Sequence, residues 1–80
     1  MHELRLVREV FEDLLRRGEA EGLQRITRVY LRMGDFSEID PEILRHLFAE
    51  ESRGTILEGA ELIIEYSPLR ELRLLSFEGE

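Results

Sequence analysis

The alternating segment at residues 25–33 is the feature that most constrains the fold of this 80-residue chain. Along it, apolar or small side chains alternate with basic or aromatic ones, as in a strand that buries one face. The two sets are Thr27, Val29, Leu31 and Met33 on one face, and Arg28, Tyr30 and Arg32 on the other. A sheet built on this strand can therefore be covered by other elements on one side only.

Helical patterns flank the strand on both sides. Apolar residues recur at steps of three and four from Leu4 to Leu14, and Gly18 predicts the C-terminal end of this first helix. The second helix is predicted to begin at Asp40, a favourable N-cap, with Pro41 at its first position. We expect it to end near residues 52–54. Its predicted apolar stripe is Ile43, Leu44, Leu47 and Phe48.

The C-terminal third predicts two further strands. Residues 60–66 and 71–77 are rich in β-formers and aliphatic side chains, and residues 67–70 contain Pro68, which favours a turn. We expect these two strands to form an antiparallel hairpin. The expected fold class is α+β, with two helices packed on one face of a three-stranded mixed sheet in the order helix-strand-helix-strand-strand. We expect a parallel crossover over the second helix to connect the first strand to the next, and we expect residues 1–80 to form a single domain.

Charge and composition exclude several classes of function. The net charge of −7 disfavours binding to nucleic acid and to anionic membranes, and favours cations and basic protein partners. No apolar run is long enough to span a bilayer, and the opening Met-His-Glu does not resemble a signal peptide. The absence of cysteine excludes disulfides, thiolate zinc ligands and a thiol nucleophile, and it agrees with a cytoplasmic location.

The N-terminus carries the most distinctive metal-binding pattern. The Met1 amine, the amide and imidazole of His2, and the Glu3 amide can place four nitrogens in a plane, a geometry that suits Ni(II) or Cu(II). Spacing alone still favours a frayed terminus with an incidental histidine. His46 has no second histidine three or four residues away, so it makes no helical metal pair. Asp40 is explained as a helix cap, and spacing does not link it to the N-terminus.

Five segments taken in order resemble the hydrogenase/urease nickel incorporation family (HypA/HybF). They cover almost the whole chain: Met1-His2-Glu3-Leu4; residues 25–34; Pro41-Glu42-Ile43-Leu44-Arg45 with Phe48; Ser52-Arg53-Gly54-Thr55 with residues 58–62; and residues 73–78. Members of this family carry a zinc module with two CxxC pairs between their second and last strands. Here a turn near residues 67–70 closes that gap, so the resemblance implies a nickel-binding domain without the zinc insert.

The resemblance implies a Ni(II) metallochaperone and not an enzyme. In the family, Ni(II) is held at the positions of Met1, His2 and Glu3, and an aspartate matching Asp40 lies nearby. The implied partners are a maturation GTPase, which docks near the first helix, and the precursor of a nickel enzyme, either hydrogenase or urease. Bound zinc is not expected, because the chain has no cysteine.

Two alternatives belong to other functional classes. A protein-interaction or homo-oligomerisation module could keep the fold after losing metal delivery, and would bind through its charged helices or an exposed sheet edge. A small metal-dependent hydrolase is the less favoured alternative. One histidine on a helix and scattered acids do not supply a base, an orienting group and a pocket together.

Overall fold

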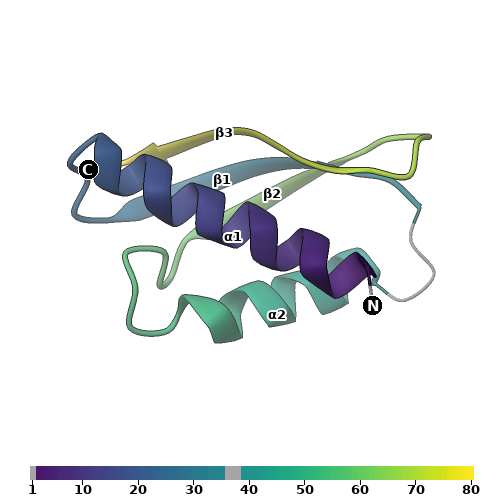
Figure 1. Ribbon diagram of the computed structural model, residues 1–80, viewed down its shortest axis with the longest axis horizontal. Coiled ribbons are helices and arrows are strands. Elements are labelled where there is room, and N and C mark those ends of the chain that lie inside the picture. Colours follow the sequence, from purple (N-terminus) through teal and green to yellow (C-terminus); the bar gives the residue numbers. More distant parts are fainter. Residues whose placement is uncertain (1, 36–38) are drawn as a thin grey trace.

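The computed structural model describes residues 2–35 and 39–80, with side chains from Leu4 onward. Its elements are helix α1 (His2–Ala20), strand β1 (Ile26–Met33), helix α2 (Pro41–Ser52), strand β2 (Glu61–Tyr66) and strand β3 (Leu72–Gly79). The two helices form one layer and the three strands the other (Figure 1). The predicted α+β class and the predicted order of elements are confirmed.

Strand β1 lies in the centre of the sheet, whose order is β2-β1-β3. β2 runs parallel to β1, from the pair Arg28–Glu61 to the pair Met33–Tyr66. β3 runs antiparallel to β1 on the other side, where Leu72 is opposite Met33. The expected mixed sheet is therefore confirmed, but the expected hairpin is wrong, because β2 and β3 each pair with β1 and not with each other.

The connection at residues 67–71 explains why no hairpin forms. It carries the chain across the end of β1: the Ser67 amide donates to the Met33 carbonyl (2.9 Å), and the Gly34 amide donates to the Glu71 carbonyl (2.8 Å). Strands on either side of a central strand are roughly 10 Å apart, a gap that several extended residues can span. Placing β1 in the centre lets the most alternating segment of the chain pair along both of its edges.

From Arg28 to Met33 the two faces of β1 have the characters that its sequence predicts. Before these residues the prediction is wrong, because Ile26 is buried in place of Thr27, which is half-buried, and the register with β3 shifts between Ile26 and Arg28. Val29, Leu31 and Met33 are 0%, 1% and 2% exposed and contribute to the core. On the opposite face, Arg28 pairs with Glu61 (Nε–Oε1 3.1 Å) and accompanies Tyr30. The Tyr30 hydroxyl, and secondarily the charge of Glu61, raise the pKa of the Arg28 guanidinium. The outer face of the sheet is thus held by cross-strand polar contacts and exposed to solvent.

Helix α1 continues past the glycine that predicted its end. Gly18 lies inside the helix and is buried, and a Cβ there would stand 2.8 Å from Ile56 Cδ1 and 2.9 Å from Ile26 Cδ1. The helix terminates instead through Gly22 (φ 71°), with the Leu23 amide donating to the Gly18 carbonyl (3.0 Å). Gly18 serves close packing and Gly22 supplies the left-handed conformation, so the helix extends beyond its predicted end.

Helix α2 begins as predicted and ends at Ser52. Its apolar stripe is narrower than predicted, because Ile43 is 43% exposed. The rings of Phe11 and Phe48 meet edge to face at a centroid distance of 5.7 Å and join the two helices within the core. Ile39 and Leu57, both outside regular elements, are 5% and 0% exposed and complete this core. Among the described residues, neither helix is both long and apolar enough to cross a membrane.

Candidate metal site

The predicted nickel donors map to one end of the molecule. Helix α1 begins at His2, and its first turn lies at the same end of the long axis as the start of α2, where Asp40 is located (Figure 1). Met1 and the side chains of His2 and Glu3 lie outside the described part of the structure. The fold therefore brings the backbone of His2 and Glu3 to the same end of the molecule as Asp40.

The backbone of the first turn of α1 supplies nitrogens that suit a chelate. The first four N–H groups of an α-helix have no acceptor within the helix. Because α1 starts at His2, the amides of His2 and Glu3 belong to this group. The positive end of the helix dipole disfavours a cation there. Binding through deprotonated amides offsets this effect, because each lost proton adds a negative charge beside the ion.

Asp40 caps helix α2, as its sequence position predicts. Its backbone is extended (φ −106°, ψ 175°), and its Oδ1 accepts a hydrogen bond from the Ile43 amide at 2.8 Å. The residue is exposed, so its carboxylate is accessible to solvent. The capping role is confirmed by this contact. A second role as an oxygen donor to a metal stays a prediction.

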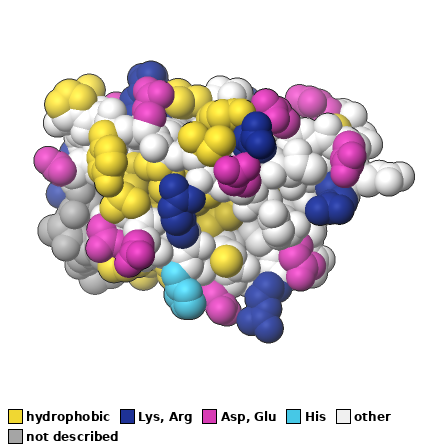
Figure 2. Space-filling model, turned by 180° about the vertical axis from the view of Figure 1, so that it is seen from behind, with side chains coloured by type: hydrophobic (Ala, Val, Ile, Leu, Met, Phe, Trp, Pro, Cys, Tyr) yellow, Lys and Arg dark blue, Asp and Glu magenta, His cyan; other side chains and the backbone are white. Residues whose placement is uncertain are grey.

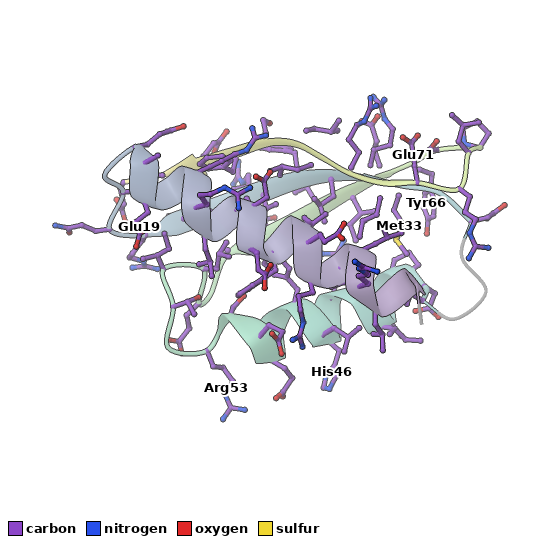
Figure 3. All side chains as sticks on the ribbon, in the orientation of Figure 1. Glu19, Met33, His46, Arg53, Tyr66 and Glu71 are labelled. Carbon is purple, nitrogen blue, oxygen red and sulfur yellow. The ribbon has the colours of Figure 1, made fainter. Side chains whose placement is uncertain are left out.

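The other polar side chains are dispersed. Within residues 4–35 and 39–80, no three histidine, aspartate or glutamate side chains converge on a point where an ion could bind. His46 is exposed and extends away from the outer side of α2 (Figure 3). Figure 2 shows acidic and basic side chains interspersed over one face of the molecule, with no large area of a single sign. In this part of the chain, side chains alone do not build a metal centre.

The β2–β3 connection lies at the same end as the predicted chelate. Tyr66, the last residue of β2, and Glu71, the last residue of this connection, lie near the end of β1 marked by Met33 (Figure 3). Its backbone is ordered by the Ser67 hydroxyl, which donates to Glu71 Oε2 (2.5 Å) and accepts from the Leu69 amide (3.1 Å). Tyr66 and Leu69 are 73% and 65% exposed. Sequence reasoning located this turn but missed that it lies at the same end of the molecule as the start of α1, which follows from β2 running parallel to β1.

An apolar groove of ≈ 400 Å³ runs between the two helices, beside the first half of α1. Its lining includes Phe11 and Phe48 from the core and Leu4, which is half-exposed (50%). The charged residues at this groove are Arg5, Arg8 and Glu51. A groove of this composition suits an apolar side chain of another protein better than a metal ion.

Comparisons with known proteins identify a family and several curated relatives. A family described as hydrogenase/urease nickel incorporation, metallochaperone, HypA matches residues 1–72. A hydrogenase maturation factor HypA from Methanosarcina mazei is 40% identical over 68 residues, which are 85% of this chain and 50% of that protein. One from Chlorobium limicola is 40% identical over 65 residues, 81% of this chain and 56% of that protein. A hydrogenase maturation factor HybF from Salmonella typhimurium is 35% identical over 68 residues, 85% of this chain and 60% of that protein.

The chain spans about half to three-fifths of the length of these curated relatives. The match with the family nevertheless begins at residue 1 and includes α1, β1, α2 and β2 in full. The relatives are named as maturation factors, and the family is described as metallochaperones. The chain belongs to the hydrogenase/urease nickel incorporation (HypA) family.

Proposed function

We propose that this chain binds Ni(II) at its N-terminus and delivers the ion to the precursor of a nickel enzyme, a hydrogenase or a urease. The observation that carries this proposal is the family match, which begins at Met1 and so includes the segment Met1-His2-Glu3. The nickel ion is the cargo. Its donors are the Met1 amine, the amide and imidazole of His2 and the Glu3 amide.

The start of α1 supports this donor set. The amides of His2 and Glu3 have no intrahelical acceptor, so the ion competes with solvent and not with a helical hydrogen bond. Closing five-membered chelate rings through successive backbone nitrogens needs ψ near zero, about 40° from the helical value. We therefore expect binding to reshape the first turn of α1 and to leave the packed remainder, from Val7 onward, unchanged.

Asp40 is proposed as an additional oxygen donor or as a hydrogen-bond acceptor for the bound imidazole. It lies at the same end of the molecule as the first turn of α1, and the N-cap bond uses its Oδ1 atom. A carboxylate close to a nickel-bound imidazole would orient the ring and lower the net positive charge of the site.

Transfer of the ion requires partners, and the groove between α1 and α2 is proposed as the surface that docks a maturation GTPase. The groove is apolar, and one of its lining residues is the half-exposed Leu4, which is close in sequence to the predicted chelate. We propose that delivery takes place in the cytoplasm and without a zinc module. The five residues between β2 and β3 leave no room for such a module between these strands, and the 80 residues include no cysteine.

Calorimetric titration with Ni(II) tests the proposal directly. The protein should carry Met1 as its free first residue and should be compared with His2→Ala and with a variant extended by two residues before Met1. We expect one tightly bound equivalent for the natural terminus and none for either variant, with unchanged helical circular dichroism from the body of the fold. Equal binding by all three proteins would refute the terminal chelate and leave a protein-interaction role as the better explanation.

A further inference from the structure

Strand β3 is an edge of the sheet. β1 lies on one side of it, and none of the described elements lies on the other (Figure 1). An antiparallel edge strand presents alternate unpaired N–H and C=O groups that can pair with a further strand. β3 has eight residues, the same length as the central strand β1.

A β-bulge divides this edge strand into two halves. Tyr30 of β1 is opposite Ser76, whereas the next residue, Leu31, is opposite Leu74. Leu75 is therefore an extra residue in β3. Leu75 and Ser76 are both exposed, as expected when one added residue interrupts the alternation of faces.

Because of the bulge, two side chains at equal distances from the centre of β3 lie on the same face of the sheet. Arg73 and Glu78 are an odd number of positions apart and would lie on opposite faces of a regular strand. Here both are exposed on the outer face, where Arg73 is opposite Arg32 and Glu78 accepts a hydrogen bond from the Tyr30 hydroxyl (3.2 Å). On the inner face, Leu74 and Phe77 both pack against the core.

This symmetry makes β3 complementary to itself. If two copies pair antiparallel about the point between Leu75 and Ser76, Arg73 of each copy is opposite Glu78 of the other. The same register sets Leu74 opposite Phe77 on the inner face. Opposite charges and aromatic–aliphatic pairs are both favourable when they lie directly across two strands. The two-fold axis repeats each pair, so four favourable pairs follow from one register.

The other edge of the sheet lacks this complementarity. The exposed charges of β2 are Glu61 and Glu65, which are both acidic and already pair with Arg28 and Arg32 of β1, so β2 offers no opposite charge to a second copy. In addition, the Arg45 guanidinium of α2 donates to the Leu62 carbonyl, so a helix side chain already contacts the backbone of β2. Self-association is therefore favoured at β3 and disfavoured at β2.

We propose that a second copy of this chain binds along β3 in antiparallel orientation and joins two three-stranded sheets into one continuous sheet. β3 starts opposite Met33, at the end that holds the predicted chelate. Antiparallel pairing consequently sets the two candidate metal sites at opposite ends of the dimer and leaves both open. Association and nickel binding are independent properties of the chain, so either can fail without the other.

Sedimentation equilibrium over a range of protein concentrations tests the proposal, with Arg73→Glu as the decisive variant. This change sets two carboxylates opposite each other at both outer positions of the interface, and we expect association at least about tenfold weaker. Within one copy the change removes the exposed ion pair of Arg73 with Glu71 (3.9 Å) and sets the new carboxylate opposite Arg32. Exposed ion pairs contribute little to stability, so the variant should stay folded. The double variant R73E/E78R restores opposite charges across the interface and should recover association.

The matched control is Arg53→Glu, which changes the net charge equally at an exposed site on the far side of α2 (72% exposed). It should associate nearly as the unchanged protein does. Protection of the amides of residues 72–79 from hydrogen exchange should rise with protein concentration. A protein that stays monomeric up to roughly millimolar concentration, or equal association by the Arg73→Glu and Arg53→Glu variants, would overturn the proposal.

Discussion

Gly34 lies directly beneath the carbonyl of Leu69: a Cβ atom added to Gly34 would stand 1.3 Å from that oxygen and 2.6 Å from the carbon. The contact exists because residues 67–71 cross the end of β1 between β2 and β3. Two hydrogen bonds flank the crossing, one from the Ser67 amide to Met33 and one from the Gly34 amide to Glu71. The absence of a side chain at residue 34 is therefore a condition for the observed order of strands.

Gly34→Ala should destabilise the fold by about 3 kcal/mol or more, because backbone atoms of the crossing segment must move to accommodate the methyl group. Urea unfolding followed by circular dichroism measures this loss. Gly22→Ala is the matched control. It sits at φ 71° with no atom within 4 Å of its added Cβ, so it should cost only about 1 kcal/mol of backbone strain. Similar losses in both variants would contradict the role assigned to the crossing.

Phe48→Ala should remove a large part of the stability of the protein. Phe48 is 4% exposed and meets Phe11 edge to face, and truncation of such a residue costs about 3–5 kcal/mol. Small domains have stabilities of a similar size. Phe48→Leu retains most of the volume and should cost about 1.5 kcal/mol. Thermal unfolding monitored in the far ultraviolet separates the two variants, and an Ala variant as stable as the Leu variant would show that this ring contact contributes little.

Substitutions of Asp40 separate its capping role from its proposed metal role. Asp40→Ala removes the acceptor for the Ile43 amide and should destabilise the protein by about 1 kcal/mol. Asp40→Ser keeps a capping oxygen and should stay within a few tenths of a kcal/mol of the parent. If the carboxylate assists nickel, both variants should bind the ion about tenfold more weakly. Unchanged nickel affinity in the stable Ser variant would restrict Asp40 to the helix cap.

Nickel affinity should rise steeply with pH. The proposed donors include an amine with a reference pKa of about 7.7–8.0, an imidazole near about 6.5 and two amides that lose protons on binding. Protons compete with the ion at each of these atoms, so affinity falls as the pH falls. Titrations between about pH 6 and about pH 8.5 should show the logarithm of the association constant increasing by roughly two to three per pH unit near neutrality. A flat profile would exclude amide coordination.

Local patterns in the sequence predict the elements of this fold well. The alternation in β1 gives its buried face correctly, because Val29, Leu31 and Met33 all enter the core. Asp40 and Pro41 fix the start of α2 because capping depends on neighbouring backbone groups alone. Gly18 led to a wrong prediction of the end of α1, because its role does not depend on neighbouring residues in the sequence. Its role is set by Ile26 and Ile56, which are distant in sequence, and no local pattern distinguishes a packing glycine from a capping one.

The order of the strands was not predictable from the same patterns. A short connection between two strands normally indicates a hairpin, and the crossing over Gly34 depends on β1 already occupying the centre of the sheet. For the candidate site, the sequence supplied the donor types through the family resemblance. The common location of Asp40 and the start of α1 required the fold, because residues on different elements come together only through packing.

The separation of β2 from β3 also determines where this architecture can accept new sequence. β2 and β3 each pair with β1 and not with each other. A longer segment in place of residues 67–71 would therefore leave both strand pairings of the sheet intact. Lengthening such a loop costs little, about 0.6 kcal/mol for each doubling. The two attachment points of an inserted unit would lie at the end of the molecule that carries the proposed nickel donors. The sheet can therefore accept an insertion without losing strand pairing, at the end of the molecule where the proposed donors lie.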